Sequence, residues 1–139
     1  MVELNERVKQ VLPEIIRIND NIRQALFDRP PINRATSSVE RYEQNAILFK
    51  PLMDIFENLS YSDIICIEAI MVAGKNGSEY YEDDRLSDEE IYQEELDNLS
   101  AYEDSQTNRD FAISYITEKT FELSNYLRNG IDLLNISLD

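Results

Sequence analysis

The stretch from Leu59 to Gly77, LSYSDIICIEAIMVAGKNG, decides how the rest of the chain must fold. Every residue from Ile64 to Ala73 is apolar or small except Glu68. A helix that is apolar nearly all round has to be covered by other elements on most of its sides. The stretch therefore predicts a buried central helix over residues 61–73, with the other segments packed around it.

The residues at both ends of this helix are typical of helix termini. Ser60 and Asp63 have the spacing of a capping box, in which a serine hydroxyl accepts a hydrogen bond from a backbone N–H three residues later. Gly74 suits the left-handed position just past a helix end, and Lys75 places a cation near the negative end of the helix dipole. We therefore interpret Gly74 and Lys75 as a turn that closes the central helix.

Two amphipathic segments precede the central helix. Residues 4–28 carry apolar side chains at spacings of three and four, and Pro13 either starts a helix or kinks a longer one. We favour a short lead-in followed by a helix over residues 13–27. A second helix is predicted over residues 38–58, bent at Pro51. Its short connection to the central helix suggests that these two helices pack as antiparallel neighbours.

Three helices are predicted after the central one. Ser87 opens a helix over residues 88–102 with a thin apolar stripe, which should be the least stable of the set. A short helix is expected to start near Thr107, and a longer amphipathic one spans residues 120–136. Gly130 lies inside this last helix, where a close approach to another helix would be one reason to keep it.

These segments predict one all-α domain over residues 1–139. The expected architecture is a compact bundle of five or six helices around the central helix, with residues 38–58 and 120–136 as its main walls. A hydrophobic content of 42% suffices for a real core, and no segment shows a useful β-strand alternation.

The charge is strongly negative and unevenly distributed. The chain has 28 acidic and 13 basic residues, a net charge of −15. Residues 79–104 hold twelve of the acids and a single base, Arg85, so most of the excess lies in an acidic segment at residues 78–104. Such a surface repels nucleic acids and anionic lipids, so neither is an expected partner. The plainer interpretation is that the charge keeps the protein soluble.

Missing residue types exclude several kinds of chemistry. The chain has no histidine, which excludes nucleophilic triads with an imidazole base and the common Cys/His zinc sites. Cys66 is the only cysteine, so it forms no internal disulfide. No apolar run reaches the length of a membrane span, and the N-terminus lacks a signal-peptide pattern. We expect a cytoplasmic protein without a metal or other cofactor.

Two short motifs are AIMVAGK at residues 69–75 and NYLRNGIDLL at residues 125–134. The first is similar to the Ala-Leu-Met-Trp-Leu-Gly-Arg signature, and the second to the Asp-Tyr-Leu-Glu-Glu-Gly-Leu ending, of a bacterial family of unknown function numbered thirty-seven seventy-five. Val72 stands where the family has tryptophan, and Lys75 where it has arginine. The resemblance implies a shared helical fold over most of the chain and adds no chemistry.

Two groups of carboxylates are candidates for an active or metal site. Glu68 would have a raised pKa if it were buried, which would suit a general acid, but we expect it on the one exposed edge of the central helix. Glu79, Glu82, Asp83 and Asp84 could gather a hard cation such as Ca²⁺ or Mg²⁺. They lack the ligand spacing of an EF-hand, so a solvated acidic loop is the favoured interpretation.

Tyrosines are interleaved with the acids of the acidic segment. A tyrosine among carboxylates can anchor a basic partner, because its ring buries area while its hydroxyl stays in water. The alternative is that half of these tyrosines complete the core. The leading hypothesis is a non-catalytic interaction module that binds a basic protein surface, in one variant by mimicking nucleic-acid charge. The expected contact residues are Tyr80, Tyr81, Glu82, Asp83, Asp84, Glu89, Tyr92 and Glu95.

The competing hypothesis is a carboxylate-based enzyme or divalent-metal protein centred on Glu68 or on the loop from Glu79 to Asp84. Self-association into a homodimer through an exposed apolar stripe is a further expectation. Composition and spacing favour the interaction module, because no catalytic constellation is complete in the sequence.

Overall fold

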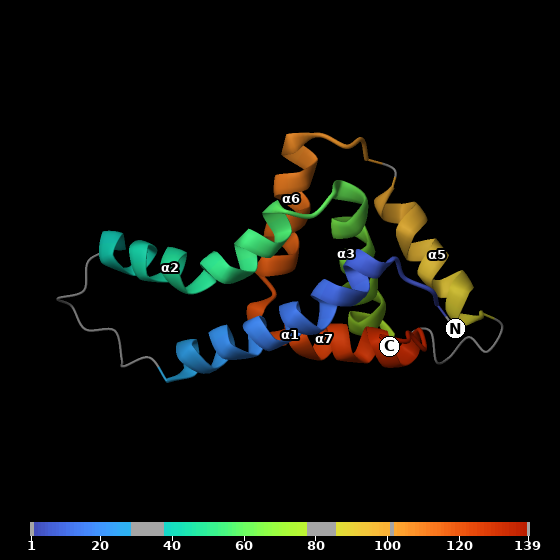
Figure 1. Cartoon of the computed structure of the whole chain (residues 1–139), viewed down its shortest axis with the longest axis horizontal. Coiled ribbons are helices and arrows are strands. Elements are labelled where there is room, and N and C mark those ends of the chain that lie inside the picture. The colour runs from blue at the N-terminus through green and yellow to red at the C-terminus, as the bar shows by residue number, and fades with distance from the viewer. Residues whose placement is uncertain (1, 29–37, 78–85, 101, 139) are drawn as a thin grey trace.

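A computed structural model describes residues 2–28, 38–77, 86–100 and 102–138. Within these ranges the protein is all-helical, with six helices and no strand, as predicted (Figure 1). The helices are α1 (Glu6–Phe27), α2 (Ser38–Glu57), α3 (Tyr61–Lys75), α5 (Asp88–Leu99), α6 (Gln106–Thr117) and α7 (Thr120–Leu133).

The central helix of the bundle is α3, and its burial confirms the main prediction. The helix packs against α7, α5, α6 and α1. Ile64, Ile67, Ile70 and Met71 are completely buried, and these apolar side chains form the middle of the core. Burial of each such side chain contributes about 1.5–3 kcal/mol, so these four residues make a large contribution to the stability of the core.

Two glycines hold α3 and α7 in backbone contact. A Cβ atom on Gly74 would lie 1.8 Å from the carbonyl oxygen of Tyr126, and one on Gly130 would lie 2.1 Å from the carbonyl oxygen of Ile70. Any larger residue would force the helices apart. The predicted close approach at Gly130 is confirmed. The predicted left-handed C-cap at Gly74 is wrong, because Gly74 lies within α3 and Asn76 is the C-cap.

Side-chain caps start the helices largely where the sequence predicts. The Ser60 hydroxyl accepts a hydrogen bond from Asp63 N at 3.1 Å, and the Ser87 hydroxyl accepts one from Glu90 N at 3.2 Å. The N-cap of α6 lies two residues earlier than expected: the hydroxyl of Ser105, a residue in an extended conformation, accepts a hydrogen bond from Asn108 N at 3.1 Å. Thr107 is therefore inside the helix, and the prediction that it opens α6 is wrong.

The first helix is continuous from Glu6 and carries Pro13 within it, so the predicted start at residue 13 is wrong. Val8, Val11, Leu12 and Ile15 are all buried on one face. Because this face continues through the proline, packing against the core outweighs the hydrogen bond that the proline ring removes. A buried Asn19 then ties α1 to α7, since its Nδ2 donates to Thr120 O and Ser124 Oγ, both at 2.9 Å.

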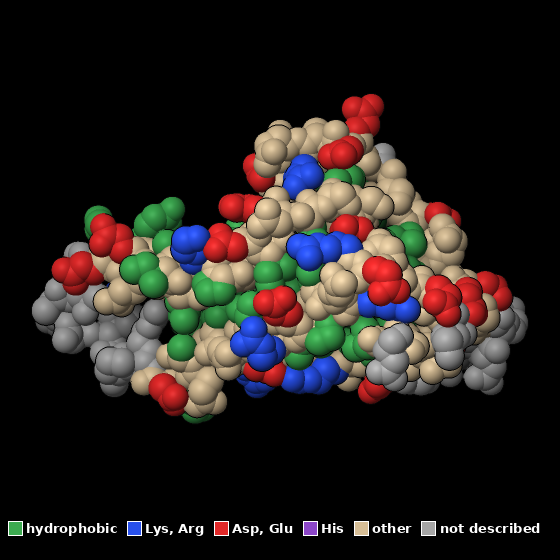
Figure 2. All heavy atoms as spheres, viewed as in Figure 1, with side chains coloured by type: hydrophobic (Ala, Val, Ile, Leu, Met, Phe, Trp, Pro, Cys, Tyr) green, Lys and Arg blue, Asp and Glu red, His purple; other side chains and the backbone are tan. Residues whose placement is uncertain are grey.

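The second helix is not the antiparallel neighbour of α3 that its short connection suggested, and it is not a main wall of the bundle. It packs mainly against α1, and Figure 1 shows it extending away from the other helices. Its C-terminal half enters the core through Leu52 and Phe56, whereas Val39, Tyr42 and Ile47 in the other half are exposed. Figure 2 shows hydrophobic side chains on the surface near its outer end.

Candidate binding pocket between α3, α5 and α6

Glu68 is buried, and the expectation that it lies on an exposed edge is wrong. It follows Tyr61 by seven residues, two helical turns, so both side chains lie on the same face of α3. Both α5 and α6 pack on α3, and Figure 1 shows them on opposite sides of it. Only 8% of Glu68 remains exposed.

A pocket of about 370 Å³ opens above this face of α3. Its size is within the range of small-molecule sites. One stripe of α6 forms a wall, because residues 108, 111, 112 and 115 follow the spacing of a single helix face. Ala112 is the small member of the stripe, and a larger side chain there would fill part of the space. The lining residues are Tyr61, Glu68, Leu99, Tyr102, Asn108, Phe111, Ala112 and Tyr115.

The carboxyl group of Glu68 has no compensating partner in the part of the chain that the structure describes. It makes no hydrogen bond or ion pair with any of these residues. Burial raises the pKa of Glu68 to about 7, because removal from water disfavours the charged form. Burial also raises the pKa of the Tyr61 phenol, and the negative charges of Glu68 and Asp104 add to that effect.

Aromatic rings form the rim of the pocket and remain open to solvent. Tyr102 is 64% exposed and Phe111 is 73% exposed, although both are large side chains that usually bury most of their surface. The Tyr115 ring already accepts a cation, since Lys119 Nζ lies 5.2 Å from its centroid. The pocket therefore combines one buried carboxyl group with several aromatic rings and contains no basic side chain among its described lining residues.

The exposed surface of α5 leads to this pocket. Glu89, Glu90, Glu94 and Asp97 face solvent, and the helix contains no basic residue. Leu99, the last residue of α5, lines the pocket. The helix thus provides a negative surface that ends at the aromatic rim.

The predicted contact residues divide into three groups. Glu89 is exposed as expected, whereas Tyr92 and Glu95 are buried on the inner face of α5. Burial raises the pKa values of the Tyr92 phenol and of the Cys66 thiol, two groups that also influence each other's pKa. Tyr92 therefore completes the core, which was the alternative interpretation, and does not offer an anchor at the surface. Tyr80, Tyr81, Glu82, Asp83 and Asp84 lie outside the described residues.

Sequence reasoning missed most of the pocket. The sequence predicts a short helix near Thr107, but it does not indicate that one face of its apolar stripe, with Phe111, Ala112 and Tyr115, lines a pocket. The sequence does contain one indication, because the apolar residues of this helix cover more than one face. Ile113 and Ile116 are buried against the core, which leaves Phe111 and Tyr115 on a second face. Among the described lining residues Glu68 is the only carboxylate, so the paired acids of a carboxylate enzyme do not come together here.

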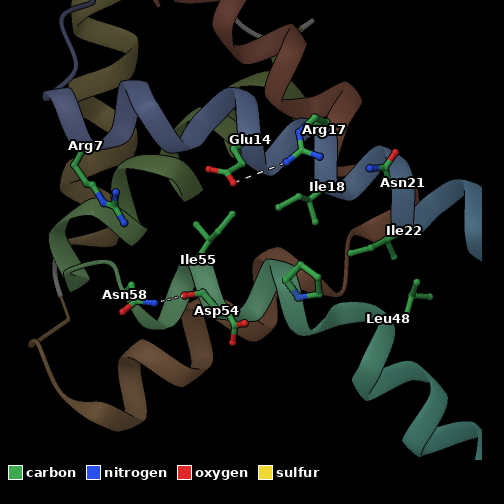
Figure 3. A pocket seen from close by; sticks show the side chains of 11 residues that line it. Arg7, Glu14, Arg17, Ile18, Asn21, Ile22, Leu48, Asp54, Ile55 and Asn58 are labelled. Atoms are coloured by element: carbon green, nitrogen blue, oxygen red, sulfur yellow. Dashed lines mark hydrogen bonds and ion pairs between the residues drawn. The ribbon is translucent and has the colours of Figure 1, made fainter.

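A larger groove of about 900 Å³ separates α1 from α2, and Figure 3 shows its lining. Ile18, Ile22 and Ile55 give it an apolar floor. Its two carboxylates already have basic neighbours: Glu14 lies 3.8 Å from Arg17, and Asp54 lies 2.9 Å from Lys50. The groove is open apolar surface with paired charges at its edge, and no buried group in it lacks a partner in the way that Glu68 does.

Neither a metal centre nor a bilayer-spanning helix is found in the described ranges. No group of three side chains that could hold a metal ion occurs there, and the acidic loop proposed for a hard cation, from Glu79 to Asp84, is outside them. Among the helices from α1 to α7, none is both long and apolar enough to cross a bilayer.

Comparisons with family models, with curated proteins and with solved structures found no match for this chain. The resemblance of residues 69–75 and 125–134 to a bacterial family therefore stays a prediction. Within the fold, these two motifs lie on α3 and α7 and include the glycines that contact each other's helices, Gly74 and Gly130.

Proposed function

We propose that this chain is a non-catalytic, cytoplasmic protein-interaction module that binds a basic protein surface at the end formed by α5 and α6. The observation that carries the proposal is that exposed carboxylates and exposed aromatic rings adjoin each other at this end. Exposed carboxylates on α5 lead to the exposed rings of Tyr102 and Phe111, with no basic side chain on α5.

The carboxylates and the rings have different roles in this proposal. Complementary charge accelerates the encounter and suppresses wrongly charged partners, while buried aromatic area supplies most of the binding energy. Tyr102 and Phe111 take the anchoring role that the sequence had suggested for Tyr92, because they are exposed and Tyr92 is not. A partner that covers both rings would remove their apolar surface from water.

The row of carboxylates on α5 also supports the more specific variant, in which this surface mimics the charge of a nucleic acid. In that case the partner is a nucleic-acid-binding protein, and DNA or RNA should displace it from this chain. If DNA or RNA does not displace a bound basic partner, the interaction-module proposal stands and the mimicry variant is rejected.

Partner capture with charge-reversed variants tests the proposal. Glu90→Lys with Glu94→Lys changes two exposed residues of α5, and Glu43→Lys with Glu57→Lys makes the same change of charge on α2. We expect basic proteins to bind the wild type at low salt, to dissociate at high salt, and to be lost only from the α5 variant. Equal loss from both variants would mean that net charge alone drives the binding, and salt-independent capture would contradict the proposal.

A further inference from the structure

The pocket between α3, α5 and α6 holds a charge that lacks a counter-ion. Glu68 is more than nine-tenths buried, lines the pocket, and has no hydrogen-bond or ion-pair partner in the described ranges. A buried carboxylate without a partner is costly, and a positive group placed beside it would remove much of that cost. The pocket is therefore preorganised for a ligand that supplies a positive charge.

The aromatic lining restricts the kind of cation. Tyr61, Tyr115 and Phe111 come from two helices and present rings to the same space. Such rings attract an organic cation through their negative faces and also cover an aliphatic chain attached to it. Lys119 shows that the Tyr115 ring tolerates an ammonium group at 5.2 Å. A hydrated metal ion would gain little from these rings and would find a single carboxylate.

We propose that this pocket is a binding site for an alkylammonium group, such as the end of a lysine side chain, with Glu68 as its counter-ion and the aromatic rings around its aliphatic stem. The proposal deepens the proposed function, and it rests on that function only for the statement that the ammonium group belongs to a basic protein. The pocket itself can be tested with a small amine.

Other ligand classes fit the pocket less well. An anion would be repelled by Glu68 and by Asp104, whose charge reaches Tyr61 at the same site. A neutral apolar molecule would fill the space but leave Glu68 buried and unpaired. A neutral polar molecule could donate one hydrogen bond to Glu68, yet it would gain nothing from the ring faces. An alkylammonium ion satisfies the carboxylate and the rings together.

Binding should depend on pH through Glu68. Burial raises the pKa of Glu68 to about 7, and the ammonium ion pairs with the ionised form. The other titratable side chains in the pocket lining are the phenols of Tyr61, Tyr102 and Tyr115, and α5 contributes only Leu99. Asp104 is the further charged group that acts on this site, through its effect on Tyr61. Amine affinity should therefore rise from pH 5.5 to pH 8.

The experiment is a titration of the full chain with n-butylammonium, which reproduces the end of a lysine side chain, followed by NMR of the aromatic and α6 resonances. Butanol is the neutral analogue of the same length. Glu68→Gln removes the charge and keeps the shape, and Glu94→Gln makes the same chemical change on the exposed face of α5. Unfolding curves of each variant establish that it is folded.

We expect saturable binding of n-butylammonium with shifts confined to the pocket, and at least about tenfold weaker binding of butanol. Glu68→Gln should lose at least about tenfold in amine affinity, while Glu94→Gln should stay within about twofold. No saturable binding by the wild type, or equal losses in the two variants, would overturn the proposal. If basic proteins are captured in a salt-sensitive way, and neither n-butylammonium nor Glu68→Gln changes that capture, the proposed function stands and this site is rejected.

Discussion

The two sides of α3 are built in opposite ways. On the side of α7, the helices approach so closely that Gly74 and Gly130 place backbone against backbone. On the side of α5 and α6, a pocket of about 370 Å³ remains, and Glu68 lies buried in it without a partner. One side of α3 is therefore closed by direct backbone contact with α7, whereas the side chains on the other side leave an open pocket.

This difference indicates that stability and binding are separated across α3. Tight packing on the α7 side leaves no tolerance for added atoms, because interiors are packed about as densely as organic crystals. The α5 and α6 side tolerates an empty volume and an uncompensated carboxyl group, both of which lower stability. Substitutions on the two sides should therefore differ in what they change, and the following predictions test that difference in order of expected effect.

Gly130→Ala should destabilise the protein most. Its Cβ would lie 2.1 Å from the carbonyl oxygen of Ile70, so α3 and α7 would have to move apart. Overpacking costs about 1–3 kcal/mol and occasionally more, and a clash with backbone atoms belongs at the upper end; the better helix propensity of alanine returns up to about 1 kcal/mol of that. We expect the free energy of unfolding in urea to fall by about 2 kcal/mol or more, while the pocket retains its amine affinity in the folded fraction.

Asn129→Ala is the matched control for this prediction, because residue 129 is exposed on the same helix. The substitution adds helix propensity without meeting another helix, so the free energy of unfolding should stay the same or rise slightly. If Gly130→Ala is as stable as Asn129→Ala, the close crossing of α3 and α7 is not what holds the two helices together.

Glu68→Gln should stabilise the protein at high pH, in contrast to the glycine substitution. The pKa of Glu68 is about 7 in the folded state, and it lies near 4.5 for an unburied glutamate. Between these values the folded state binds more protons than the unfolded state, so stability falls as the pH rises. The contribution of Glu68 protonation to the free energy of unfolding is therefore fully present below about pH 4.5 and lost above about pH 7. The loss amounts to about 2 kcal/mol after allowance for water in the pocket.

The measurement is urea unfolding of the wild type and of Glu68→Gln at pH 5 and pH 8. The two proteins should have similar stability at pH 5, and the variant should be more stable by about 2 kcal/mol at pH 8. Glu94→Gln, on an exposed position, should follow the wild type at both values. Parallel pH profiles for Glu68→Gln and the wild type would show that Glu68 is hydrated in the folded state.

Most of the helical order was predictable, since it depends on local patterns. The apolar run from Ile64 to Ala73 predicts a buried helix whatever surrounds it, and Ser60 and Ser87 mark helix starts through hydrogen bonds within one turn. The role of Gly74 was not predictable in this way. A glycine followed by Lys75 looks like a C-cap until the partner helix is known, and only α7 makes the close contact.

The position of Glu68 shows a second limit. A helix that is apolar all round has no preferred outer edge, so its sequence cannot say which neighbours cover its single acid. The α6 helix shows the same limit, because the apolar spacing that includes Phe111 and Tyr115 predicts a face but not what that face meets. The pocket arises from the packing of α5 and α6 on α3, and this packing depends on contacts between residues far apart in the chain.

Ser87→Ala should weaken α5 and leave the α3–α7 crossing unchanged. The Ser87 hydroxyl accepts a hydrogen bond from Glu90 N at 3.2 Å, and loss of such a cap costs about 1 kcal/mol. The acids in the first turn still favour the helix dipole, so the helix should fray without being lost. Hydrogen exchange should accelerate in residues 88–99 and not in α7. Equal acceleration in both helices would mean that α5 unfolds only with the whole domain.

Phe111→Ala should have the smallest effect on stability and a clear effect on binding. The side chain is 73% exposed, so its removal should change the free energy of unfolding by no more than about 0.5 kcal/mol. In the alkylammonium site its ring covers the aliphatic stem of the ligand, and its loss should weaken n-butylammonium binding several-fold. Phe121→Ala is the matched control, since Phe121 is also exposed but lies on α7, outside the pocket lining.

Unchanged amine affinity in Phe111→Ala would remove this ring from the site, and equal losses in both variants would show that the amine binds exposed phenylalanines without selection. A loss confined to Phe111→Ala, at unchanged stability, would establish that the open side of α3 serves binding while the closed side serves the fold.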